Sequence, residues 1–128
     1  MPCRSIIAQQ LSEILKVIAH PDRVRLIEEL KAGELDVTAM AELLDVPAAR
    51  VSQHLALMRA HRLVEEKRDG RRHLYHLAQP ELADWLLDGV AILEHRASND
   101  VASKKIYEAG RKLWAEAGAD KPQNGKTQ

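Results

Sequence analysis

The sequence is poor in aromatic residues and has a single cysteine, Cys3. With two Trp, two Tyr and no Phe, its core must be filled mainly by aliphatic side chains. One cysteine excludes a disulfide within the chain. No apolar run is long enough to span a bilayer, and we expect neither a signal peptide nor contact with a membrane. We therefore expect a cytoplasmic protein with one core, which 128 residues can support.

The chain also lacks the arrangements that catalysis requires. Its six histidines, its carboxylates and Cys3 show no spacing that pairs a nucleophile with a base, and no glycine-rich loop could hold a phosphate. We expect no catalytic residue, no cofactor and no enzymatic activity. Cys3 is most simply an exposed thiol, although it could pair with its copy across a dimer and so have a redox role.

An excess of either charge is absent too, because the formal net charge is zero. A neutral total argues against nucleic-acid binding, but the charges are unevenly distributed. Residues 48–76 hold seven Lys or Arg and three Asp or Glu, whereas residues 1–47 hold five and eight. Because DNA binding depends on the local field more than on the total charge, the basic stretch is a candidate for contact with DNA.

Residues 41–76 predict two short helices joined by a tight turn and followed by a hairpin. Asp45 can adopt the left-handed conformation that the turn needs. Val46 supplies an apolar contact between the helices, and Pro47 suits the first turn of the second helix. The pattern therefore predicts a helix–turn–helix whose second helix covers about residues 48–61.

This second helix has two unlike faces. Val51, Leu55 and Met58 recur at i, i+4 and i+7, the spacing of a buried stripe. The polar side chains off this stripe are Arg50, Ser52, Gln53, His54 and Arg59. Such side chains suit a DNA major groove, where Arg contacts guanine, Gln contacts adenine, and Ser or His reaches phosphates or base edges. A solvated helix in any α-rich domain is the alternative interpretation.

The hairpin is predicted by Asp69-Gly70, which lies between two β-capable runs at residues 63–68 and 71–77. Four cationic side chains flank its tip: Lys67, Arg68, Arg71 and Arg72. One interpretation is a hairpin that contacts DNA phosphates beside the second helix. A solvated loop is the other interpretation.

Four features occur in order along the chain: the segment AHPDRVRLIEELKAGELDV, the spacing from Ala41 through Val46 to Val51, the string VSQHL and the ending DGRRHLYHL. Together they resemble the ArsR/SmtB family of bacterial repressors, over about residues 11–95. The resemblance implies a mostly α, α+β fold, a winged helix–turn–helix, with the hairpin as the wing. It also implies a homodimeric transcriptional repressor that binds double-stranded DNA and leaves it when a sensor site is occupied.

Outside this unit, apolar stripes predict helices over about residues 5–19, 22–32 and 80–96, and a helix carrying Met40 that Asp36 or Thr38 can cap. The resemblance places the helices over residues 5–19 and 80–96 at a dimer interface. For the first of these two helices, packing within one subunit is the alternative. The expected interface residues are Leu11, Ile14, Trp85, Leu86, Gly89 and Ile92.

We expect residues 1–97 to form the DNA-binding and dimerisation domain. Residues 98–117 would add a C-terminal helix that Ser98 caps, and residues 118–128, which include Gly, Pro and Lys, would form a disordered tail.

The sensor sites of the family are not matched. Many members have a Cys-x-Cys pair where this chain has Asp36 and Thr38, so the thiolates that capture soft metals or arsenic are missing. By position, the second site of the family falls on Gln79, Glu81, Ile92 and His95. Of these, only Glu81 and His95 could bind a metal, which is too few for tight binding of zinc. We expect no metal site, and an unidentified small-molecule effector stays open.

A winged helix used as a protein–protein interaction module is the alternative function. The basic wing and Arg50 favour DNA instead, and the dependence of DNA binding on ionic strength separates the two.

Overall fold

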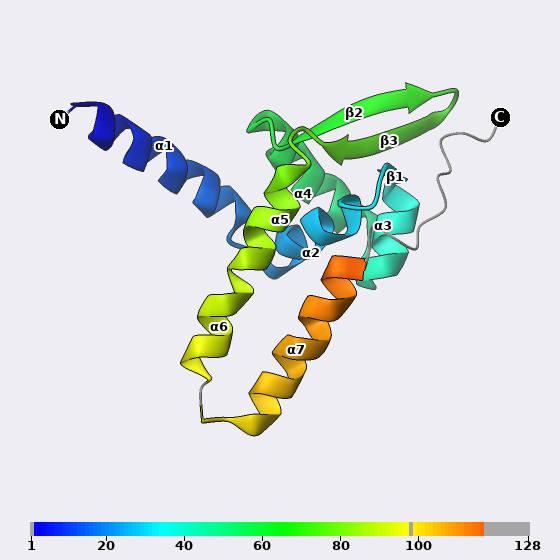
Figure 1. Cartoon of the computed structure of the whole chain (residues 1–128). Coiled ribbons are helices and arrows are strands. Elements are labelled where there is room, and N and C mark those ends of the chain that lie inside the picture. The colour runs from blue at the N-terminus through cyan, green and yellow to red at the C-terminus, as the bar shows by residue number, and fades with distance from the viewer. Residues whose placement is uncertain (1, 98, 117–128) are drawn as a thin grey trace.

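The computed structural model of the protein describes residues 2–97 and 99–116 (Figure 1). The helices are α1 Pro2–Ile18, α2 Pro21–Leu30, α3 Val37–Leu44, α4 Ala48–Ala60, α5 Glu81–Asp88, α6 Val90–Arg96 and α7 Val101–Glu116. The strands are β1 Leu35–Asp36, β2 Val64–Asp69 and β3 Arg72–Leu77. None of the described helices combines the length and the apolar character needed to cross a membrane. The expected tail, residues 118–128, lies outside the described residues.

The helix–turn–helix forms as its sequence predicts. The side chain of Asp36 caps α3 by accepting a hydrogen bond from the Ala39 amide at 2.8 Å. Asp45 ends α3 in the left-handed conformation, with φ 55° and ψ 49°. Pro47 is extended, with ψ 143°, and precedes the first residue of α4. The capping and turn residues thus fix where α3 ends and α4 begins.

The core lies where α2, α3, α4 and the sheet meet. Val51, Leu55 and Met58 of α4 are fully buried, which confirms the predicted stripe. They belong to one apolar cluster with Leu26 and Met40. This burial fixes the rotation of α4 and leaves its opposite side exposed.

The sheet has three strands in the order β1-β3-β2. β2 and β3 pair antiparallel, as predicted, but the last pair is Asp69 with Arg72, so the two turn residues are Gly70 and Arg71. Of the two, only Gly70 has a positive φ, 66°, as a turn with glycine in its first central position requires. The turn therefore falls one residue later than Asp69-Gly70 indicates. β1, which pairs with β3, was not predicted because two residues carry no alternation.

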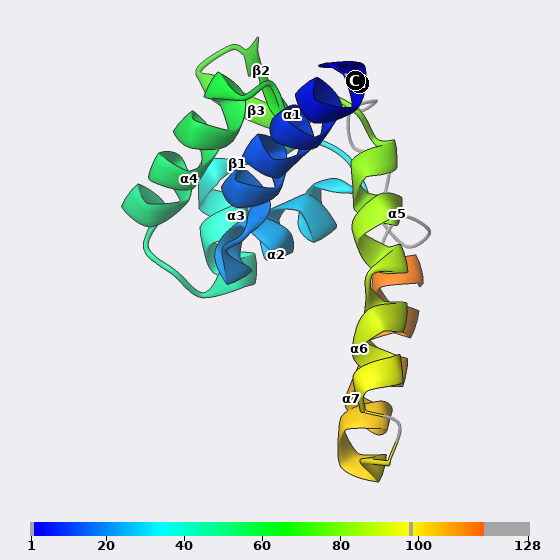
Figure 2. The same ribbon diagram turned by 90° about the vertical axis from the view of Figure 1, so that its left-hand side faces the viewer.

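The single helix expected over residues 80–96 is two helices, α5 and α6, which meet at Gly89. α7 follows and lies antiparallel beside α6, and this pair extends away from the rest of the chain (Figures 1 and 2). Asp100 accepts from the amides of Ala102 and Ser103 at 3.2 and 3.4 Å, so it has the capping role expected of Ser98, which lies outside the described residues. The last turn of α7 reaches α2, where Lys31 Nζ donates to the Trp114 carbonyl at 3.4 Å.

Candidate nucleic-acid interface

The exposed side of α4 carries most of the polar residues singled out from the sequence. Ser52 and Gln53 are exposed, and Arg50 and Arg59 extend into solvent from the two ends of the helix. Because the apolar stripe holds the other side against the core, these side chains lie on the solvent-exposed side of α4. This is the arrangement that a helix entering a major groove requires.

His54 does not lie on that exposed side, so the expectation that it faces the groove is wrong. Its exposure is 7%. Position 54 is three residues after Val51 and precedes Leu55, which places it on the buried stripe at spacing i, i+3, i+4 and i+7. The sequence therefore held the signal, but the polar character of histidine obscured it.

The buried His54 side chain has two hydrogen-bond partners from α2. Arg23 Nε donates to His54 Nδ1 at 3.0 Å, so the ring proton belongs on Nε2, which lies 3.2 Å from Asp22 Oδ2. Burial lowers the pKa of His54; the hydrogen bond to Asp22 opposes this, while the nearby His20 and Arg23 reinforce it. The neutral ring thus connects α4 to the start of α2.

His20, Asp22 and His54 also bring three potential metal-ligand atoms within 4.8 Å of one another. Their hydrogen bonds do not suit a metal. Both rings accept an N–H at Nδ1, from the Asp22 amide at 3.1 Å for His20 and from Arg23 for His54. A ring that binds a metal through Nε2 carries a hydrogen on Nδ1 and donates it, which would oppose these donors. The cluster is better explained as a cap of α2 and a support for α4.

The hairpin places its basic residues on the same surface as α4. Arg68 and Arg71 are exposed near its tip. Arg71, Arg72 and Ser52 line one groove of about 430 Å³, together with Thr38 from α3. Ser52 on the exposed side of α4 therefore shares a groove with the basic side chains of the hairpin.

Asp36 and Thr38, which stand where the family resemblance places thiolates, have other roles here. Asp36 caps α3 through Oδ1, and its Oδ2 accepts from Arg72 Nη2 at 3.3 Å. Thr38 is exposed. Glu81 and His95 are exposed at the start of α5 and near the end of α6, and neither belongs to a ligand cluster in the part of the chain that is described. Cys3 is exposed near the start of α1.

The residues expected at a dimer interface divide into two groups. Leu11, Trp85 and Ile92 are exposed, whereas Ile14 and Leu86 pack against the core of the same chain. Gly89, at the junction of α5 and α6, is partly buried. In Figure 1 the N-terminal part of α1 extends away from the rest of the chain.

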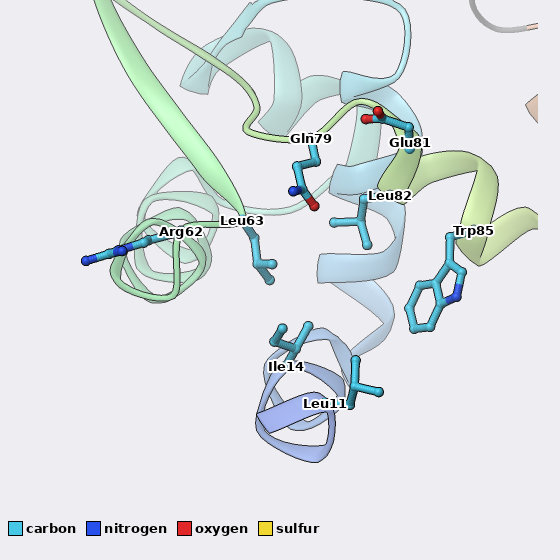
Figure 3. A pocket seen from close by; sticks show the side chains of 8 residues that line it. All are labelled: Leu11, Ile14, Arg62, Leu63, Gln79, Glu81, Leu82 and Trp85. Atoms are coloured by element: carbon cyan, nitrogen blue, oxygen red, sulfur yellow. The ribbon is translucent and has the colours of Figure 1, made fainter. Parts of the chain in front are cut away.

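A cavity of about 300 Å³ opens between α1 and α5. Figure 3 shows that Leu11 and Ile14 of α1 face Leu82 and Trp85 of α5 across this space, whereas the side chain of Arg62 points away from it. The sides of the cavity that α1 and α5 form are therefore apolar.

The described fold, a helix–turn–helix followed by a basic β-hairpin, is a winged helix. The family model for the bacterial regulatory proteins of the arsR family matches residues 20–66. The transcriptional repressor PagR of Bacillus anthracis is 36% identical over 72 residues, which cover 56% of this chain and 72% of that relative. The chain belongs to the arsR family.

Two further comparisons agree with this assignment. The HTH-type transcriptional repressor SmtB of Mycobacterium tuberculosis is 38% identical over 79 residues, which cover 62% of this chain but only 58% of that relative. A solution structure of Mb0332 from Mycobacterium bovis has a TM-score of 0.64 and 26% identity, and the match covers 76% of this chain and 91% of that one. That structure is described as a homodimeric winged helix–turn–helix DNA-binding domain.

Proposed function

We propose that this protein is a cytoplasmic, homodimeric transcriptional repressor that binds an inverted repeat in double-stranded DNA, and that it has no catalytic role. The observation that carries the proposal is the groove that Ser52 of α4 shares with Arg71 and Arg72 of the hairpin. Side chains of α4 would meet base edges in the major groove, and the hairpin would contact phosphates. Two relatives, SmtB and PagR, are named as transcriptional repressors, which supports repression over activation.

The proposed dimer uses the apolar surface of α1 and α5 and continues onto the exposed Ile92 of α6. Leu11 and Trp85 are exposed on the two sides of the cavity between these helices, and a second copy would cover them. Two copies related by a dyad would present their α4 helices about 34–36 Å apart, one turn of DNA. The homodimeric state described for Mb0332 supports this assembly.

We propose no metal effector. The network around His54 directs N–H donors at both imidazole rings, and Asp36 is engaged by Arg72 and by the cap of α3. Control by a small organic molecule in the dimer cleft, by oxidation at Cys3 or by abundance of the protein stays open, in this order.

The test is to map the DNA that the protein protects on the genome that encodes it. The expected result is a site with two half-sites whose centres are about one helical turn apart. Affinity for that site should fall steeply as salt rises. A protein that binds no duplex at low salt would refute the proposal and favour a protein–protein interaction module.

A further inference from the structure

Two cations of the proposed wing are paired with carboxylates of this chain. Arg72 Nη2 lies 3.3 Å from Asp36 Oδ2. Lys67 Nζ lies 3.8 Å from Glu34 Oε2. These carboxylates come from the segment that enters α3, and not from the hairpin itself. In the free protein, the segment before α3 therefore neutralises part of the basic charge of the wing.

The two cations at the ends of α4 are paired in the same way. Arg59 Nη1 lies 3.0 Å from Glu66 Oε1 of β2. Arg50 Nη1 lies 3.9 Å from Asp22 Oδ2 of α2. Of the cationic residues proposed to contact DNA, only Arg68 and Arg71 near the wing tip have no ion pair within the described residues. We refer to Asp22, Glu34, Asp36 and Glu66 as the acidic partners.

In each of the four ion pairs, the cationic side chain is more exposed than the carboxylate. The side chains of the four cations are 54–61% exposed, whereas those of the acidic partners are 17–31% exposed. The cations therefore lie outermost, with the carboxylates beneath them. A DNA phosphate can reach each cation from outside, but it then lies close to a fixed negative charge. The acidic partners come from α2, the segment before β1, the cap of α3 and β2, so no single local motif explains the pattern.

We propose that the acidic partners set the sequence-independent affinity for DNA by opposing the phosphates that the cations attract. This inference rests on the proposed DNA-binding function. Sequence-independent affinity comes from phosphate contacts, and none of the acidic partners pairs with Ser52 or Gln53, the α4 side chains proposed to read bases. The acidic partners thus keep the protein from being retained on DNA that lacks its site, because they neutralise part of its basic surface.

The test uses a double variant, Asp36→Asn with Glu66→Gln. Asparagine keeps an oxygen that can cap α3, so the change removes charge while the cap is retained. The matched control is Glu65→Gln with Glu108→Gln, which changes the net charge by the same amount. Glu65 neighbours Glu66 on β2 but points to the other face of the strand and pairs with His76 at 2.9 Å.

Binding to a labelled duplex of arbitrary sequence is measured by fluorescence anisotropy at several salt concentrations. A phosphate on each cation would lie within one Debye length of the paired carboxylate. Removing the charge of one carboxylate should therefore lower Kd about threefold, and the double variant should bind about tenfold more tightly than the wild type at low salt. The control should gain clearly less. Circular dichroism melting checks that the variants are folded. Glu34 lies outside the helices and strands, so Glu34→Gln tests the effect of a third acidic partner on DNA affinity without changing a helix or strand residue.

The outcomes separate this inference from the proposed function. If the wild-type protein binds no duplex at low salt, both are refuted. Only this inference is refuted if the wild type binds but neither the double variant nor Glu34→Gln binds more tightly than the wild type. The same holds if the double variant binds no more tightly than the control. Weaker binding would show that the carboxylates orient the cations for DNA instead of opposing it.

Discussion

Arg23 Nε donates to His54 Nδ1 at 3.0 Å, and this hydrogen bond joins α2 to the buried side of α4. It fixes the proton of the neutral ring on Nε2, 3.2 Å from Asp22 Oδ2. A second proton on His54 would have to occupy Nδ1, where it would oppose the guanidinium of Arg23. The position of α4 therefore depends on His54 staying neutral.

The first prediction is a loss of stability in mild acid. Burial lowers the pKa of His54 below its usual value of 6.5, so the unfolded chain binds this proton more readily than the folded protein. The free energy of unfolding should therefore decrease as the pH falls below 6.5 toward the lowered pKa. Urea unfolding at a series of pH values should show this decrease in the wild type and a smaller one in His54→Gln. Parallel pH profiles for the two proteins would mean that His54 is not responsible.

The burial of His54 also shows what the sequence could and could not predict. The stripe of Val51, Leu55 and Met58 was predicted because apolar periodicity reports packing directly. His54 occupies the i+3 position of the same stripe, but a polar residue is buried only when partners exist, and Arg23 and Asp22 are about thirty residues away in the chain. Tertiary hydrogen bonds of this kind leave no local pattern.

Two features of the fold were beyond prediction for similar reasons. β1 consists of Leu35 and Asp36, which form a strand only because β3 lies beside them. The register of the hairpin depends on whether Gly70 is the first or second turn residue, and both are compatible with Asp69-Gly70. By contrast, the left-handed Asp45 and the Asp36 cap of α3 follow from local chemistry. Asp45 was predicted, and Asp36 was one of the two candidates for the cap.

The second prediction concerns base contacts from α4. Gln53→Ala should relax base preference at one position of the site and cost about 1–3 kcal/mol of discrimination. Ser52→Ala should weaken binding to all sequences to a similar degree. Anisotropy with the mapped site and with single-base variants of it measures both effects. If the double alanine variant binds and discriminates like the wild type, α4 is not the reading helix.

The third prediction concerns the wing. Replacing Arg71 and Arg72 with Ala should reduce the slope of log K against log salt by about one for each phosphate contact that is lost. Arg71→Ala alone is the cleaner variant, because Arg72 also pairs with Asp36. Lys112→Ala on α7, an exposed cation outside the proposed interface, is the control. A slope that stays at the wild-type value would remove the wing from the contact with DNA.

The fourth prediction concerns assembly. Ile92 is 66% exposed, so Ile92→Glu should fold and yet fail to dimerise, because a charge placed in an apolar contact is costly. Leu86→Glu should instead give insoluble protein, since Leu86 packs against the core of its own chain. Sedimentation velocity measures the first result and solubility the second. Leu113→Glu, an exposed apolar position on α7, is the control; a soluble, dimeric Ile92→Glu protein would exclude α6 from the interface.

The last prediction is that micromolar zinc, cadmium or arsenite will not specifically release the protein from its DNA site. Soft metals and arsenite need thiolates, and the positions that could supply them hold Asp36, which caps α3 and pairs with Arg72, and the exposed Thr38. The His20, Asp22 and His54 cluster has ligand atoms within 4.8 Å of one another, yet both of its rings accept N–H donors at Nδ1.

The measurement is a titration of each metal into the protein–DNA complex, with a chelator added at the end. Stoichiometric, reversible release that persists in Cys3→Ser would show that a metal site exists. Repeating the titration with His20→Gln and with His95→Gln would then locate it. Loss of release in His20→Gln would mean that a metal displaces the Arg23 donor from His54 and so moves α4. Loss in His95→Gln would point to the end of α6, with Glu81 as its partner across the dimer.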